Sequence, residues 1–208
     1  METKTAPPAE RRRPALELAS TIRHDGAGGV ADDLATVEGL AAWLREQEGL
    51  LPPGALPEAD ERLREEVTAL RRAVRALFAR AVSPAPPSRA DANRLMPVEE
   101  ALAALNAAAA LEPVVPRLTW PAGDRPTAGL VPAGDGDAGP GAVLIAALAR
   151  AAVDFLGGPD REQLRACTAP RCVRYFLRSH GRQAWCKPSC GNRARVARHA
   201  ERHRSPQP

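Results

Sequence analysis

The sequence predicts a mainly α fold, in which a helical N-terminal domain is followed by a small module made of a β-hairpin and a helix. Three observations lead to this prediction. Apolar residues recur three and four residues apart in several segments of the first 160 residues, as on the buried face of a helix. Alanine is abundant, which favours helix, and aromatic residues make up only 3% of the chain. The four cysteines all lie within 24 residues near the C-terminus, which sets that region apart.

The N-terminal residues 1–14 are polar and rich in proline, and we expect them to be disordered. We expect no signal peptide, because Glu17 interrupts the short apolar stretch that follows three arginines. Leu16, Leu18 and Ile22 could dock on the core. The predicted helical domain covers residues 15–158.

Two helices are predicted in the first half of this domain. The first begins at a cap, Asp32 or Asp33, and runs to about Glu48, where Gly49 and the Pro-Pro-Gly stretch at residues 52–54 end it. Its inward residues are expected to be Leu34, Val37, Ala41 and Leu44. The second covers residues 60–82, with apolar residues at 4,3,4,3 spacing: Leu63, Val67, Leu70, Val74 and Leu77. Its solvent-facing side is expected to consist of Glu61, Arg62, Arg64, Glu65, Glu66, Arg71 and Arg72.

Two more helices and a β-prone segment complete the predicted domain. Residues 98–111 read as a helix with proline near its first turn and beyond its end. Residues 114–120 are β-prone, and residues 121–141 are dense in glycine and proline, which indicates a loop or a loose hairpin. The last helix covers residues 143–156 and stops at two glycines. Its inward residues are expected to be Leu144, Leu148, Ala151 and Phe155.

Charge is distributed unevenly along the chain, whose formal net charge is +4. Residues 161–208 contain twelve Lys or Arg and two acids, which gives this region +10 and leaves −6 for the first 160 residues. An acidic body with a strongly basic C-terminal region indicates a polyanionic partner for that region.

The cysteines are spaced as Cys167-x4-Cys172, thirteen residues, and Cys186-x3-Cys190. Each short pair can present two thiolates, and four thiolates satisfy the tetrahedral coordination that zinc prefers. In a reducing compartment such a cluster favours a metal site over a disulfide framework. We therefore predict one structural zinc ion. Four cysteines leave no open position for a catalytic one, and in a module of about forty residues the metal would supply most of the folding free energy.

Two alternatives to this ligand set stay open. One is a disulfide framework. The other is a set of Cys186, Cys190, His199 and His203, because the two histidines have finger-like spacing. This second set leaves two cysteines unused, and its eight residues between Cys190 and His199 are fewer than the usual ~12.

The module reads as a hairpin followed by a helix. Residues 173–177 are strand-like, residues 183–185 could return as the second strand, and residues 192–204 read as a helix. The aromatic side chains are expected to fill the small core beside the metal, although they could instead stack on bases. These residues are Tyr175, Phe176 and Trp185.

Arginines follow the last cysteine at a density typical of a phosphate-binding surface. Arg195, Arg198 and Arg202 share one helix face at 3,4 spacing. The residues predicted to bind nucleic acid are Arg182, Lys187, Asn192, Arg193, Arg195, Arg198 and Arg202. Asn192 and Arg193, at the helix start, could instead support the metal site, and the whole stretch could be a solvated basic tail.

The residues around the second cysteine pair form a recognisable motif. Trp185-Cys186, Cys190-Gly191-Asn192-Arg193 and the following residues 194–199 resemble the CGNR zinc-finger family. The preceding part resembles the helical ABATE domain that accompanies such fingers, in residues 16–22, 43–44, 70–75 and 105–106. The chain departs from many members at residues 177–178 and 183–184, where those members carry an acidic residue and a run of arginines.

The resemblance covers nearly the whole chain and implies a bacterial, stress-responsive transcription regulator. It implies a helical ABATE-like domain over residues 15–158 and a zinc finger of treble-clef-like or ribbon-like fold over residues 161–204, held by the four cysteines. We expect the finger to bind DNA, and the helical domain to sense an unknown small-molecule ligand or to mediate assembly. The alternative is a zinc-stabilised RNA-binding or protein-interaction module.

Other functional classes lack support in the sequence. We find no Ser/His/Asp set, no phosphate-binding loop and no paired carboxylates in a catalytic context, so we expect no enzyme; Asp135 and Asp137 read as part of a turn. Residues 142–156 form the most apolar run, but they include Arg150 and Asp154 and are shorter than the ~20 residues of a membrane span. We expect a cytoplasmic protein, associated with the nucleoid if it binds DNA.

Overall fold

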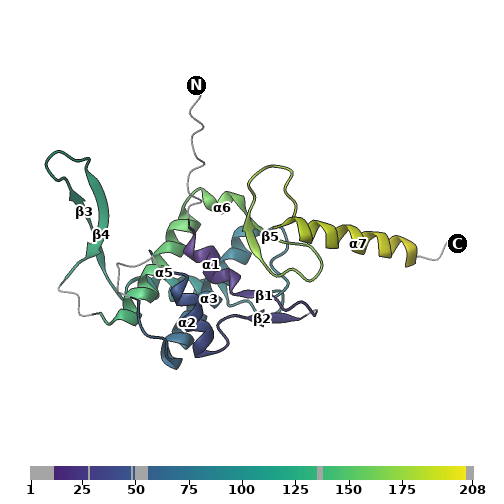
Figure 1. Cartoon of the computed structure of the whole chain (residues 1–208), viewed down its shortest axis with the longest axis horizontal. Coiled ribbons are helices and arrows are strands. Elements are labelled where there is room, and N and C mark those ends of the chain that lie inside the picture. Colours follow the sequence, from purple (N-terminus) through teal and green to yellow (C-terminus); the bar gives the residue numbers. More distant parts are fainter. Residues whose placement is uncertain (1–11, 28, 48, 50–55, 135–137, 205–208) are drawn as a thin grey trace, which may run out of the picture.

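The structure is a computed structural model that describes residues 12–27, 29–47, 49, 56–134 and 138–204 (Figure 1). Within those ranges the chain forms seven helices and six short strands, which confirms a mainly α fold. In chain order they are α1 (Pro14–Ser20), β1 (Ile22–His24), β2 (Val30–Asp32), α2 (Val37–Arg45), α3 (Glu61–Val82), α4 (Val98–Ala109), β3 (Val114–Thr119), β4 (Thr127–Pro132), α5 (Pro140–Gly157), α6 (Asp160–Gln163), β5 (Leu164–Ala166), β6 (Tyr175–Leu177) and α7 (Pro188–Arg204).

The predicted disordered segment, residues 1–14, includes Arg13 and Pro14, which are ordered in the structure. Pro14 is the first residue of α1, and Arg13 forms an ion pair with Asp160 at 2.6 Å. Residues 1–11 lie outside the described residues, as do the predicted helix stop at residues 52–54 and the predicted turn at residues 135–137.

Helix α3 is the central element of the helical domain, and it matches its prediction closely. The Asp60 carboxylate caps it by accepting a hydrogen bond from the backbone N–H of Leu63 at 2.7 Å. The five predicted inward residues, from Leu63 to Leu77, are all buried. Helices α1, α4 and α5 pack against α3, and Phe78 and Leu148 lie at the centre of the resulting core.

The prediction of a solvent-facing Arg71 is wrong. Its side chain is buried and donates two hydrogen bonds to the Asp32 carboxylate, at 2.5 and 2.6 Å, and one to the Thr21 hydroxyl at 2.9 Å. The second half of α3 is buried on nearly every side, from Ala73 to Ala79. An amphipathic pattern therefore describes only the first half of the helix, and Arg71 and Arg75 are buried against acidic partners.

The first predicted helix begins later than expected. Helix α2 starts at Val37, and the Thr36 hydroxyl caps it by accepting from the backbone N–H of Gly39 at 3.1 Å. Asp32 instead ends β2, which pairs antiparallel with β1, and Leu34 is buried outside any helix. Helix α2 also ends at Arg45, short of the predicted Glu48.

Residues 114–132 form a hairpin that projects away from the helices (Figure 1). Strands β3 and β4 pair antiparallel. Directly paired residues, and alternate residues along each strand, lie on the same face of the hairpin, and one of its two faces is wholly apolar. That face consists of Val114, Pro116, Leu118, Ala128, Leu130 and Pro132. Leu118 and Leu130 are 66% and 58% exposed, so no described part of the chain covers them.

Helices α4 and α5 differ from prediction mainly at their ends. Helix α4 ends at Ala109, and α5 begins at Pro140 and extends to Gly157. The buried alanine in the last turns of α5 is Ala152, not Ala151. In the part of the chain that the structure describes, α5 alone has the length and mean hydropathy of a membrane span, but it packs against α1, α3 and α4 in the core.

Candidate metal centre

The first cysteine pair lies in the connection of a hairpin that differs from the predicted one. Strand β6 pairs with β5, which precedes Cys167, and residues 183–185 form no strand. The backbone N–H of Cys167 donates to the carbonyl of Arg174 at 2.9 Å, which extends the pairing toward the cysteines. Arg171 has a φ of 61°, and this left-handed residue turns the short connection so that Cys172 returns toward Cys167.

The second pair connects the loop to α7. Cys186 lies in the loop, and Cys190 lies in the first turn of the helix, which begins at Pro188 rather than at the predicted Asn192. The backbone N–H of Cys190 donates to the carbonyl of Lys187 at 3.0 Å. Cys190 therefore lies in the first helical turn, at the positive end of the helix dipole.

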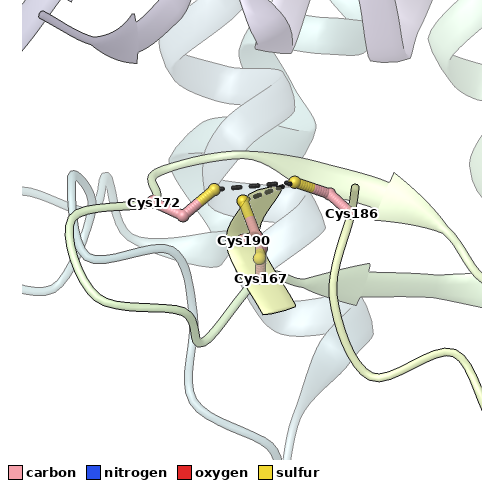
Figure 2. Close-up of side chains that lie close together, drawn as sticks. All are labelled: Cys167, Cys172, Cys186 and Cys190. Atoms are coloured by element: carbon pink, nitrogen blue, oxygen red, sulfur yellow. Dashed lines mark hydrogen bonds between the residues drawn. The ribbon is translucent and has the colours of Figure 1, made fainter. Parts of the chain in front are cut away.

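The four sulfur atoms form one compact group (Figure 2). All lie within 4.8 Å of one another, and the Sγ atoms of Cys172 and Cys190 lie 3.7 and 3.5 Å from that of Cys186. A tetrahedral zinc site with Zn–S bonds of about 2.3 Å places its sulfurs about 3.8 Å apart. A disulfide requires about 2.05 Å, so the disulfide alternative does not fit.

The thiols perturb one another strongly, because they are crowded and largely buried. Hydrogen bonding with Cys172 raises the pKa of Cys167 to about 11, while hydrogen bonding with Cys167 lowers the pKa of Cys172. The pKa of Cys186 is raised, chiefly by hydrogen bonding with Cys167. A divalent metal supplies the positive charge that lets neighbouring thiolates share one site.

Arg193 supports the cysteine cluster. Its guanidinium donates to the sulfur of Cys190 at 3.1 Å and to the carbonyl of Pro170 at 3.3 Å, which ties α7 to the loop of the first pair. Gly191 has a packing role, because a Cβ at this position would lie 3.2 Å from the Trp185 ring. Of the two residues whose role was open, Arg193 therefore faces the cluster, whereas Asn192 is exposed and accepts a hydrogen bond from Arg195.

The rival ligand set is wrong. The histidine rings of His199 and His203 face each other on the exposed surface of α7, with their Nε2 atoms 3.1 Å apart. Among the described residues, the group that can hold a metal ion consists of the four cysteines. Two of the three aromatic residues lie near them, since Phe176 packs in the cysteine cluster and Trp185 packs against it.

The side chain of Tyr175 points away from the cysteines and into the core of the helical domain. Its ring makes an edge contact with Phe78, with the ring centroids 5.5 Å apart, and its hydroxyl donates to Asp91 at 2.8 Å. Burial raises the pKa of Tyr175, and the negative charge of Asp91 raises it further. The phenol therefore stays protonated and acts as a hydrogen-bond donor.

A buried network that sequence reasoning missed joins the two parts of the chain. Arg75 donates to Asp91 at 2.8 and 2.9 Å and to the carbonyl of Val173 at 3.3 Å. The Ser88 hydroxyl donates to the same carbonyl at 2.8 Å. One signal could have revealed Arg75, because it is the only polar residue between Ala73 and Ala79.

Six of the seven residues predicted to bind nucleic acid are exposed on one side of the module. Arg182, Lys187, Asn192 and Arg195 line a surface hollow of about 340 Å³ beside the cysteine loop. The last two, Arg198 and Arg202, follow along α7. Arg193 is set apart from this surface by its contact with Cys190.

Two family models match the chain. The ABATE model, described as "Putative stress-induced transcription regulator", matches residues 12–159. The chain belongs to the ABATE family. The CGNR zinc-finger model matches residues 163–203, so in this ABATE protein Cys167, Cys172, Cys186 and Cys190 bind one structural zinc ion. A comparison with curated proteins found no match.

Proposed function

We propose that this ABATE protein is a transcription regulator that binds duplex DNA through the exposed side of α7. The observation that carries the proposal is the placement of this basic helix. Helix α7 has 17 residues, about 25 Å of helix, and extends away from the body (Figure 1). Arg195, Arg198 and Arg202 are all exposed along it.

The charge of this surface suits a polyanion. Glu201 is the only acid in α7, and residues 161–208 carry a net charge of +10. Arg182 and Lys187 continue the positive surface beyond the helix start. The major groove of B-DNA, about 12 Å wide, accommodates an α-helix, and each phosphate contact releases counterions.

The other parts have supporting roles in this proposal. The zinc ion and Arg193 fix the angle at which α7 leaves the module, because both hold Cys190 in the first helical turn. The helical domain senses a ligand or mediates assembly, and the chain acts at the nucleoid in the cytoplasm. No catalytic reaction is part of this proposed function.

The test is a salt titration of binding to random-sequence duplex DNA. The Arg195→Gln/Arg202→Gln variant should bind more weakly at every salt concentration. The slope of log affinity against log salt should flatten by about two units, since each lost phosphate contact removes close to one released counterion. Arg198 is left in place, because its guanidinium packs over the Trp185 ring at 6.0 Å and its removal could disturb the finger.

The matched control is Arg62→Gln/Arg80→Gln, which removes the same charge from exposed positions on α3. This control should keep the wild-type slope, and both variants should keep one zinc per chain. Equal slopes for wild type and the α7 variant would show that α7 is not the binding surface. Failure of wild type to bind at low salt would favour a protein-interaction module.

A further inference from the structure

The helical domain contains a cavity of about 980 Å³ between β1, β2, α3 and residues 89–97. We propose that this cavity binds a small organic anion, namely a carboxylate or a phosphate attached to an apolar group. Its size suits a small-molecule ligand, since such sites typically occupy about 300–1,000 Å³.

The lining of the cavity carries an excess of positive charge. Five arginines face it, against the carboxylates of Asp91 and Glu100. Arg71 and Arg75 are already paired with Asp32 and Asp91. The other three arginines, Arg72, Arg89 and Arg94, are exposed at the rim and have no ion-pair partner among the described residues. Guanidinium groups bind carboxylate and phosphate in bidentate fashion, so these three define the charge of the ligand.

The remaining wall of the cavity is apolar except for Asn93. Ile22, Leu95 and Met96 line it, and Leu95 is 41% exposed although it is a large apolar side chain. An inorganic anion would leave these side chains in contact with water. A ligand with an apolar portion would cover them, which adds roughly 25 cal/mol for each Å² removed from water.

The cavity shares residues with the contact between the helical domain and the zinc finger. Arg75 and Asp91 line the cavity, and the same two residues bind the Val173 carbonyl and the Tyr175 hydroxyl of the finger. An anion that reaches Arg75 competes with Asp91 for its guanidinium. Binding in the cavity therefore loosens the attachment of the finger to the helical domain. This regulatory effect rests on the proposed function, in which the finger binds DNA.

The binding test uses calorimetric titration of the zinc-loaded full chain with phenyl phosphate and, separately, phenylacetate. At least one should bind, and its identity shows whether the site prefers phosphate or carboxylate. Arg89→Gln/Arg94→Gln should weaken that binding by about tenfold or more, because two charge-assisted contacts are lost. Arg62→Gln/Arg80→Gln removes the same charge outside the cavity and should bind as wild type does. Benzyl alcohol, which has the ring without the charge, should not bind.

Absence of binding by both anions at millimolar concentration, or equal affinity for wild type and Arg89→Gln/Arg94→Gln, would overturn the site. This arm contains no DNA, so its failure is distinct from failure of the proposed function. In a second arm, the bound anion should weaken duplex DNA binding by wild type about fivefold or more, and the Arg89→Gln/Arg94→Gln variant should respond far less. An unchanged DNA affinity with the anion bound would overturn the regulatory coupling.

Discussion

Asp91 lies at the contact between the two parts of the chain, where it joins Arg75 of α3 to Tyr175 of the finger. Its carboxylate accepts two hydrogen bonds from Arg75 and one from Tyr175, and all three residues are buried. An ion pair of this kind contributes little net stability compared with apolar packing. Removal of one partner is nevertheless costly, because the other charge stays buried without compensation.

We therefore predict that Asp91→Ala lowers the free energy of unfolding by about 3–5 kcal/mol. Chemical denaturation measures this loss. The control is Glu66→Ala, which removes the partner of the exposed Arg62 and should change stability by less than about 1 kcal/mol. A loss for Asp91→Ala no larger than that of the control would show that water reaches Arg75.

Asp32 makes the stability depend on pH. Burial alone would raise its pKa, but hydrogen bonds from Arg71 and the backbone of Leu34 outweigh it and hold the pKa of Asp32 below its ordinary value. A lowered pKa in the folded state means that the stabilisation is complete above the unfolded pKa of about 3.9. It is lost as the pH falls through the lower pKa of the folded state.

Asp32→Asn removes this titration. We predict that the variant is less stable than wild type at pH 7, and that its unfolding free energy falls less steeply below about pH 4. Denaturation at a series of pH values measures both. Parallel pH profiles for wild type and variant would mean that Arg71 and Asp32 do not form the ion pair in solution.

At the scale of single residues, the sequence predicts the role of a side chain where the spacing of neighbouring residues determines its chemistry. The four cysteines fall in this class, since two short pairs leave few arrangements other than a metal site. Spacing does not reveal the roles of Arg71, Arg75 and Asp91, because the hydrogen-bond partners of these side chains lie 13 or more residues away along the chain. Arg75 and Val173 are 98 residues apart. No local pattern indicates which carboxylate a buried arginine will reach.

Elements were predictable where one segment alone determines its structure. Helix α3 has an amphipathic first half and a capping aspartate, so its bounds and inward face follow from local sequence. Strand β5 was missed, because its pairing with β6 depends on a partner across the cysteine loop. The start of α2 was misplaced for a related reason, since Asp32 looks like a helix cap but is held by Arg71 on a different element.

The contrast between α3 and the β3–β4 hairpin gives a matched prediction. Leu70 on α3 is 3% exposed, and Leu118 on the hairpin is 66% exposed. Leu70→Ala should therefore cost about 2–5 kcal/mol, whereas Leu118→Ala should stay within about 0.5 kcal/mol. Chemical denaturation of both variants at low protein concentration tests this. A large loss for Leu118→Ala would show that the apolar hairpin face is buried in an assembly.

At the scale of the whole molecule, the finger and the helical domain share one core. Leu164 and Tyr175 belong to the finger by sequence, yet they pack with Phe78 and Phe155 of the helical domain. The division into an acidic body and a basic module is visible in the sequence, because charge is a local property. The shared core is not, because it depends on which side of β6 faces the helices.

This shared core leads to the last prediction, which concerns removal of the zinc ion. Without metal, nothing bridges the four sulfur atoms, and the Cys-x4-Cys connection between β5 and β6 loses its support. Because Tyr175 and Leu164 lie on those strands, the loss should spread to the helical domain. Cys186→Ser should abolish zinc binding and lower the Tm of the whole chain, and not only unfold α7.

The control, His199→Ala/His203→Ala, should keep one zinc per chain and the wild-type Tm, since both rings lie on the exposed surface of α7. Elemental analysis and thermal unfolding followed by near-UV circular dichroism measure both quantities. An unchanged Tm for the helical domain in Cys186→Ser would show that its core is complete without the finger.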